Sequence, residues 1–190
     1  MKMQCGPIRY KVSAKDQARV HPFKHLLVPR KTTFKSKLDD KDKIIPNLYG
    51  EITKNTKRNE MIFNDVLLEL EEGASPIILT ERVDHVHELE DMFERFTKNM
   101  VVLTGKLKKK ERETRLQQLK ELLDNEERLI IATGKYIGEG FDNAVLDTLF
   151  LVVPISGKEI LQQYVGRLHR VHENKEVVKV YDYVDHRETV

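Results

Sequence analysis

Two arginines near the carboxyl end of the chain carry the most specific chemistry in the sequence. Arg167 and Arg170 follow Gln163 in the segment Q-Y-V-G-R-L-H-R. On a helix, residues i and i+3 share a face, so both guanidinium groups would reach the same ligand. A guanidinium is planar and permanently charged, and two of them can clamp the oxygens of a phosphoryl group during its transfer. A purely structural alternative is that both arginines form surface ion pairs with Glu173 or Glu176.

A glycine-rich segment lies upstream of the arginines. Residues 133–142 read T-G-K-Y-I-G-E-G-F-D, in which Gly138 and Gly140 precede Asp142. Glycine has no Cβ, so the backbone can pass close to a ligand and adopt dihedral angles that other residues avoid. We therefore expect a loop that approaches a bound group, with the Asp142 carboxylate at its end. Alternatively, Asp142 caps a turn and binds nothing.

Alternating strands and helices must position these segments. Continuous apolar runs favour strands covered on both faces at residues 77–79, 100–103, 129–132, 149–153 and 177–181. Helical spacing of apolar residues occurs at residues 61–69, with a stop at Gly73, and at 83–96, 116–123 and 160–169. This order predicts an α/β fold with a central, mostly parallel sheet. Both segments begin where a predicted strand ends or open the next helix, which is the edge where such sheets bind ligands.

The order of these segments resembles a known family. The pattern A-T-G-x-x-x-G-E-G-F-D followed by Q-x-x-G-R-x-x-R resembles motifs V and VI of superfamily 2 helicases of the DEAD/DEAH type, in the restriction-enzyme and excision-repair branch. Residues 76–82 resemble motif IV, and residues 103–105 with Lys109 and Arg112 resemble the T/H-G segment that follows it. The resemblance covers roughly residues 60–185 and implies a three-layer RecA-like (P-loop NTPase-like) domain.

The resemblance implies a part in ATP hydrolysis for the arginine and glycine segments. Arg170 would be the arginine finger that neutralises charge on the transferred phosphoryl group, and Arg167 would be a second contact to the γ-phosphate. Gln163 would link this lobe to a first RecA-like lobe. Asp142 would bond the nucleotide ribose. The cofactor-binding residues expected from the resemblance are thus Asp142, Gly140 and Gly138.

The resemblance also implies contacts to the backbone of a nucleic acid. Thr133 would donate its hydroxyl to a phosphate, and Thr104 and Gly105 would offer a hydroxyl and a backbone N–H to a neighbouring phosphate. Thr80 and Arg82 would add further phosphate contacts. Such contacts position a strand and read no base. DNA is favoured over RNA, because the G-E-G-F-D and G-R-L-H-R variants resemble the restriction and repair branch.

Two elements of a complete motor are absent from the sequence. It contains neither the phosphate loop G-x-x-x-x-G-K-[ST] nor an acidic D-E-x-H or D-E-x-D segment that would hold a metal ion. ATP and Mg²⁺ would then be held mainly by the first lobe, and the isolated chain should hydrolyse no ATP. A competing interpretation is a degenerate lobe that binds nucleic acid or a protein without catalysis. A small-molecule enzyme is disfavoured, because no set of nucleophile and base is complete within the chain.

The 190 residues suit a globular protein, with 34% charged and 39% hydrophobic residues. No apolar run is long enough to span a membrane and no signal peptide opens the chain, so a cytoplasmic location is expected. Residues 1–50 hold 12 Lys and Arg against 4 Asp and Glu. We interpret residues 1–55 as a basic linker or N-terminal extension of short strands packed on the lobe, and residues 56–190 as the lobe itself. The basic stretch could follow a nucleic-acid backbone or be a solvated arm.

No metal site is expected. The single cysteine, Cys5, excludes a multi-cysteine zinc site. His85 and His87 lie two positions apart on a predicted helix, so they point to different faces and cannot share an ion. The basic run at residues 106–115 contains Glu111 and Glu113, which favours a solvated helix face over a nucleic-acid groove.

Overall fold

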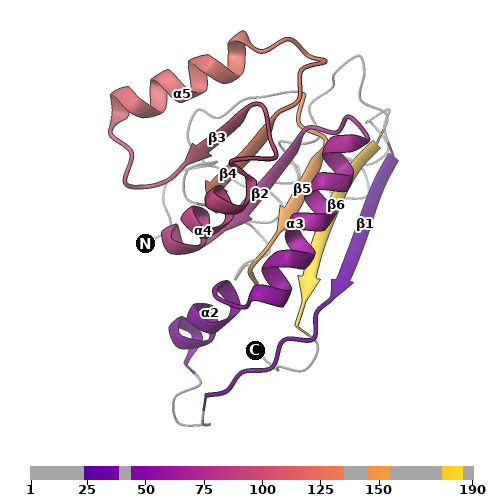
Figure 1. Ribbon diagram of the computed structural model, residues 1–190, viewed down its shortest axis with the longest axis vertical. Coiled ribbons are helices and arrows are strands. Elements are labelled where there is room, and N and C mark those ends of the chain that lie inside the picture. Colours follow the sequence, from indigo (N-terminus) through magenta and orange to yellow (C-terminus); the bar gives the residue numbers. More distant parts are fainter. Residues whose placement is uncertain (1–23, 39–43, 135–144, 155–176, 186–190) are drawn as a thin grey trace, which may run out of the picture.

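A parallel β-sheet forms the centre of the protein (Figure 1). The computed structural model describes residues 24–38, 44–134, 145–154 and 177–185. Within them, the strands are β1 (Lys24–Lys31), β2 (Pro76–Thr80), β3 (Met100–Leu103), β4 (Leu129–Thr133), β5 (Thr148–Leu151) and β6 (Val177–Val184). Their order across the sheet is β1-β6-β5-β2-β4-β3, and neighbouring strands run parallel. The predicted α/β fold with a parallel central sheet is confirmed, and the protein has the RecA-like architecture.

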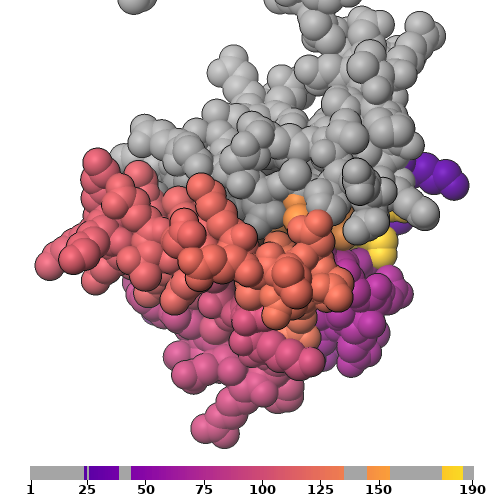
Figure 2. All heavy atoms as spheres, turned by 90° about the horizontal axis from the view of Figure 1, so that it is seen from above, coloured from indigo at the N-terminus to yellow at the C-terminus, as the bar shows by residue number. Residues whose placement is uncertain are grey.

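Helices cover both faces of this sheet. The helices of the described segments are α2 (Ile45–Thr53), α3 (Thr56–Glu71), α4 (Val83–Phe93) and α5 (Lys109–Glu121). Helices α3 and α4 pack on one face, where Ile62, Val66, Val86, Leu89 and Phe93 join the inward residues of the strands. Helix α5 lies on the other face, where it buries Leu119. In the view from above, β1 and the region of α5 lie at opposite sides of the molecule, in keeping with the strand order (Figure 2).

The central strands are buried along their whole length, which explains their continuous apolar sequences. Every residue of β2 and of β4 is buried. Ile77 and Ile130 contribute to the core beneath α5, whereas Ile78 and Ile131 contribute to the core beneath α3 and α4. Successive side chains of a strand point to opposite faces, so two covered faces require apolar residues at every position.

Helix α3 ends at the predicted stop, but it begins five residues before the predicted range of residues 61–69. The side chain of Asn55 accepts a hydrogen bond of 3.0 Å from the backbone N–H of Arg58, which caps the first turn. At the other end, Gly73 has a φ of 82°. That left-handed conformation strains any residue with a Cβ, so glycine stops the helix at the predicted place.

Two helices end earlier in the structure than their apolar sequence patterns predicted. Helix α4 ends at Phe93, and the exposed Phe96 beyond it stacks edge-on against Phe63 with ring centroids 5.1 Å apart. Leu123 lies just beyond α5 and is 67% exposed. Helix α5 itself starts at Lys109, and the side chains of Lys109 and Lys110 are exposed. This exposure agrees with the predicted solvated face of the basic helix.

The amino-terminal region takes part in the sheet. Strand β1 pairs with β6 as an edge strand, with Lys24 beside Val177 and Lys31 beside Val184. Residues 45–53 were expected to lie in an extension of short strands, but they form helix α2, which packs at the carboxyl ends of the strands. Its Leu48 and Ile52 form a small hydrophobic cluster with Phe34 and with Val153, which follows β5.

The predicted helix at residues 160–169 lies outside the described residues. Among the helices that the structure does describe, none has both the length and the apolar character needed to cross a membrane.

Candidate nucleic-acid and nucleotide interface

Three predicted strand-end hydroxyls lie together at the carboxyl edge of the sheet. Thr80 is paired with Thr133 in the register of β2 and β4. Leu103 is paired with Ala132, so Thr104 follows directly beside Thr133. Neighbouring strands lie about 4.8 Å apart, which places these threonines along roughly 10 Å of one edge. The topology thus brings together residues that are far apart in the sequence.

The hydroxyls of this edge are recessed. Thr104 is 4% exposed and Thr133 is 6% exposed. Gly105 is exposed, whereas Gly134 is buried. The carbonyl of Thr104 accepts a hydrogen bond of 3.2 Å from Leu107, which closes the turn that presents Gly105. The most accessible group of the predicted contacts on β3 and β4 is therefore the backbone of Gly105.

Thr80 is engaged in a buried hydrogen-bond relay. His85 Nε2 lies 3.1 Å from Asn59 Oδ1, and the Asn59 amide donates a hydrogen bond of 2.8 Å to the Thr53 carbonyl. The Thr80 hydroxyl lies 3.0 Å from His85 Nδ1. Burial, and secondarily the nearby charge of Arg58, lowers the pKa of His85 from 6.5 to about 3.

The relay has one consistent arrangement of protons. The Asn59 amide nitrogen is the donor to Thr53, so its Oδ1 must accept from His85 Nε2–H. The neutral imidazole then has a lone pair on Nδ1, and the Thr80 hydroxyl donates to it. Thr80 is 2% exposed, so in this conformation its hydroxyl proton points into the protein.

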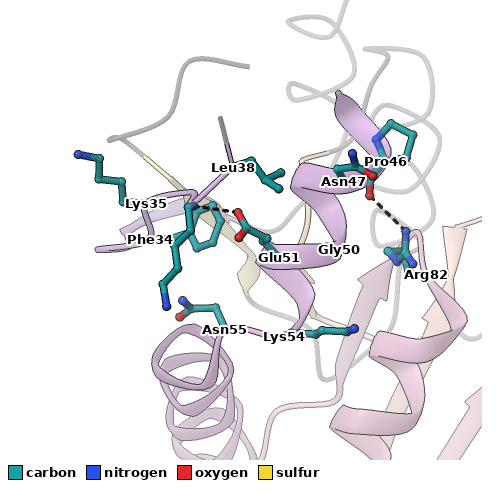
Figure 3. Close-up of a pocket in the computed structure, with 11 residues that line it drawn as sticks. Phe34, Lys35, Leu38, Pro46, Asn47, Gly50, Glu51, Lys54, Asn55 and Arg82 are labelled. Carbon is teal, nitrogen blue, oxygen red and sulfur yellow. Dashed lines mark hydrogen bonds between the residues drawn. The ribbon is translucent and has the colours of Figure 1, made fainter. Parts of the chain in front are cut away.

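Arg82 extends from the turn after β2 toward α2. Its guanidinium lies 3.5 Å from the Asp84 carboxylate and 3.5 Å from the Pro46 carbonyl (Figure 3). The Arg82 side chain is 35% exposed, whereas its Nε is buried and has no hydrogen-bond partner among the described residues. Unlike the three threonines, Arg82 retains charge and surface for a ligand.

A set of buried polar groups holds α3 against β6 beside this edge. Arg58 Nε donates to Asp185 Oδ1 over 3.0 Å, and its guanidinium also donates to the Val152 carbonyl. The Thr32 hydroxyl donates to the same Asp185 oxygen. Arg58 is thus tied to the segments that follow β1, β5 and β6. Asp185 therefore has a structural role at the end of β6.

The same helix makes two more ion pairs with the edge of the sheet. Asp65 accepts two hydrogen bonds of 2.8 Å from Arg30 on β1 and one of 2.8 Å from the Tyr183 hydroxyl. Burial, together with the neighbouring Asp65 charge, raises the pKa of Tyr183. Glu69 accepts from the Lys179 ammonium over 2.9 Å with both carboxylate oxygens. These contacts were missed by sequence reasoning, although alternate residues of β6 do carry the polar groups.

The two histidines of α4 have separate surroundings, as predicted. His85 is fully buried in the relay, whereas His87 is exposed and lies 3.2 Å from Glu90. Across the part of the chain that the structure describes, no group of three His, Cys, Asp or Glu side chains could hold a metal ion.

The residues predicted to contact the nucleotide lie outside the described part of the chain. They are Gln163, Arg167, Arg170, Asp142, Gly140 and Gly138. The last described residue before the arginine segment is Pro154. There the Tyr49 hydroxyl of α2 donates a hydrogen bond of 2.7 Å to the Pro154 carbonyl. Helix α2 therefore anchors the point from which residues 155–176 depart.

The fold and its carboxyl edge define a RecA-like helicase lobe. The helicase conserved C-terminal domain family matches residues 54–172, and the chain belongs to this family. The match spans both the glycine segment and the arginine segment. The predicted resemblance to a superfamily 2 helicase lobe is confirmed at this level.

The proteins similar to this chain include one relative from yeast and several solved structures. The Saccharomyces cerevisiae protein IRC3, provisionally named an ATP-dependent helicase, is 29% identical over 133 residues, which are 68% of this chain and 19% of the yeast protein. The chain thus spans about a fifth of that relative. T4 UvsW has a TM-score of 0.64 at 19% identity, over 86% of this chain and 33% of that one.

Two further structures are also similar in fold at low identity. The C-terminal part of the Fun30 ATPase domain has a TM-score of 0.58 at 16% identity, over 70% of this chain and 44% of that one. Domain 2 of the DEAD-box helicase Mss116p, solved bound to an RNA duplex, has a TM-score of 0.54 at 14% identity, over 86% of this chain and 54% of that one. At such identities, the likeness concerns the fold alone.

Proposed function

We propose that this chain is the C-terminal lobe of an ATP-dependent DNA helicase or translocase, which closes on ATP and Mg²⁺ held mainly by a first RecA-like lobe. The observation that carries the proposal is the family match over residues 54–172, because it includes Asp142, Gln163, Arg167 and Arg170 in the order that the chemistry needs. The sequence contains no phosphate loop, which supports the proposal that the first lobe holds ATP and this lobe supplies the arginines.

The arginine segment would act on the phosphoryl group. Arg170 is the proposed arginine finger, Arg167 a second γ-phosphate contact, and Gln163 the link to the first lobe. The guanidinium groups of the two arginines fit phosphate oxygens, because they donate paired hydrogen bonds and keep their charge at any physiological pH. Asp142 would bond the ribose, with Gly138 and Gly140 bringing the backbone close to the nucleotide.

The carboxyl edge of β3, β4 and β2 would hold the backbone of the strand. Thr133, Thr104 and Gly105 are the proposed phosphate contacts, and Gly105 is the most accessible of the three. The hydroxyls of Thr133 and Thr104 are recessed, so the lobe would admit a phosphate only at the very end of the strands. The Thr80 hydroxyl is bonded to His85 and accepts a hydrogen bond from the backbone N–H of Arg82. These bonds support a role for Thr80 in orienting the turn that carries Arg82.

DNA is the proposed strand, on the ground that the glycine and arginine segments resemble the restriction and repair branch. Mss116p domain 2 was solved bound to an RNA duplex, so RNA is the alternative strand to test against DNA. Parallel titration of the same sequence as DNA and as RNA decides between them. Tighter binding of DNA would support the DNA assignment, tighter binding of RNA would contradict it, and equal binding would show that the contacts are limited to phosphates, which both strands share.

The decisive experiment replaces Arg170 with alanine in the full-length protein that contains this chain. If Arg170 acts on charge that develops at the γ-phosphate, kcat for ATP falls on the order of 10³-fold while nucleic-acid binding and melting temperature stay unchanged. Arg170→Lys should recover little activity, because a flexible ammonium cannot reproduce the planar fork. Normal hydrolysis combined with a lower melting temperature would instead support a structural arginine and a degenerate, non-catalytic lobe.

A further inference from the structure

An open pocket of about 660 Å³ lies at the carboxyl edge, where it shares Arg82 with the residues assigned above. Three segments form it: the chain after β1, helix α2, and the turn after β2 (Figure 3). Among the described residues that line it, Lys35, Lys37, Lys54 and Arg82 are basic and Glu51 is acidic. Four cations from three segments around one hollow make it strongly positive.

The positive charges of this pocket are only partly balanced by the described residues, since Arg82 pairs with Asp84 and Glu51 is the acidic residue among the described lining. In the described segments, the ammonium groups of Lys35, Lys37 and Lys54 form no ion pair. Glu51 offsets only one of these charges, and its carboxylate accepts hydrogen bonds from the Ser36 hydroxyl over 2.5 Å and from the Lys37 backbone over 3.1 Å. These two bonds fix the chain after β1 against α2 and shape the pocket.

The lining favours an anionic backbone over a base or an apolar ligand. Phe34 is an aromatic lining residue, but it is 4% exposed and packs on Leu48 and Ile52. It therefore offers no face on which a base could stack. Recognition through several separate cations, without an accessible aromatic ring, is typical of contacts to consecutive phosphates.

The position of the pocket links it to the proposed strand-binding edge. Arg82 lines the pocket and follows Thr80 by two residues, and Thr80 lies beside Thr133 in the sheet. The line from Thr104 through Thr133 to Arg82 thus continues into the pocket and ends near β1. We propose that this pocket binds phosphodiester groups of the nucleic-acid strand and extends its path across α2. The inference rests on the proposed function, since it needs a strand at the carboxyl edge.

The test compares two double variants that remove equal charge. The pocket variant is Lys35→Gln with Lys54→Gln, and the control is Lys98→Gln with Lys120→Gln. The control lysines are also exposed, and they lie near β3 and the end of α5, away from the pocket. Each full-length protein is titrated with a labelled single-stranded DNA of mixed sequence at several salt concentrations, and melting temperatures are recorded.

The pocket variant should bind the strand about tenfold more weakly at low salt. The slope of log K against log salt should decrease by about 1.4, since each phosphate contact on a single strand contributes about 0.7. The control variant should keep the affinity and slope of the unchanged protein. An unchanged slope and affinity in the pocket variant, with Thr133→Val still weakening binding, would overturn the pocket inference and leave the proposed function intact.

Competition identifies the source of the phosphate. At constant ionic strength, neither inorganic phosphate nor ATP should remove the difference between the unchanged protein and the pocket variant. If millimolar phosphate or ATP removes it, the pocket binds a free anion and the inference is wrong. Preferential loss of polyglutamate binding in the pocket variant, with strand binding unchanged, would assign the pocket to an acidic protein. A full-length protein that binds no strand at all would overturn both proposals together.

Discussion

Arg58 and Asp185 form a buried ion pair in which the Nε–Oδ1 distance is 3.0 Å and the side chains are 1% and 4% exposed. The pair joins the first turn of α3 to the residue after β6, across 127 positions of sequence. Arg58 also donates to the Val152 carbonyl. One guanidinium thus fixes the carboxyl ends of two strands relative to the helix that covers them.

Replacement of Arg58 by methionine should lower the free energy of unfolding by about 3–5 kcal/mol, because it leaves the Asp185 carboxylate buried without its cation. Urea denaturation followed by circular dichroism measures the change. Lys109→Met serves as control, since Lys109 only approaches Glu113 to 4.0 Å in an exposed pair. A loss no larger than in that control would mean that Arg58 contributes little to stability.

The buried histidine should make stability depend on pH. The pKa of His85 is lowered from 6.5 to about 3, so the unfolded chain binds a proton at pH values where the folded protein does not. Stability is then complete above pH 6.5 and is lost as the pH falls toward 3. Between pH 7 and pH 5 the free energy of unfolding should fall by about 2 kcal/mol.

His85→Gln should remove this slope, whereas His87→Gln should preserve it because His87 is exposed. Denaturation curves at matched ionic strength across pH 5 to 7 make the comparison. An equal slope in His85→Gln and in the unchanged protein would assign the pH dependence to other groups.

The same substitution should have opposite effects at two glycines. Gly73 has a φ of 82°, so Gly73→Ala should destabilise the protein by about 1 kcal/mol through backbone strain. Gly50 lies inside α2, and a Cβ there would meet nothing within 4 Å. Gly50→Ala should therefore stabilise by up to about 1 kcal/mol. Thermal melts of both variants test the pair, and a shift in the same direction would contradict the assigned backbone conformations.

Strand-end contacts should couple nucleic acid to hydrolysis. In the full-length protein, Thr133→Val should reduce the stimulation of ATP turnover by single-stranded DNA and spare the basal rate, since the hydroxyl would contact the strand and not the nucleotide. The matched control is Thr148→Val. It makes the same change in a buried threonine at the start of β5, on the edge of the sheet opposite to Thr133. If both variants behave alike, the effect of Thr133 comes from packing.

The isolated 190-residue chain should fold and release no phosphate from ATP, with or without DNA. The reason is that it lacks the sequence elements that hold Mg²⁺ and the β-phosphate. Steady-state phosphate release should equal that of buffer. Robust magnesium-dependent turnover by the purified chain would contradict the proposed division between two lobes.

Local patterns in the sequence were sufficient to predict most of the strands and helices that form the layers of the fold. Continuous apolar runs located β2 to β6, helical spacing located α3 to α5, and Gly73 marked the end of α3. These features depend on residues a few positions apart, where side-chain direction follows directly from backbone geometry. The same patterns placed Thr80, Thr104 and Thr133 at strand ends, and the parallel register then brought them together.

Only the tertiary structure showed which polar groups far apart in the sequence pair with one another. It also showed which strand lies at the edge of the sheet. Nothing local marks Arg58 as the partner of Asp185, or His85 as the acceptor for Thr80, because a buried polar residue can be satisfied by any partner that the packing brings near. The pairing of β1 with β6 likewise depends on the order of strands in the sheet. The cationic pocket exists for the same reason, since Lys35, Lys54 and Arg82 become neighbours only when α2 packs across the carboxyl edge.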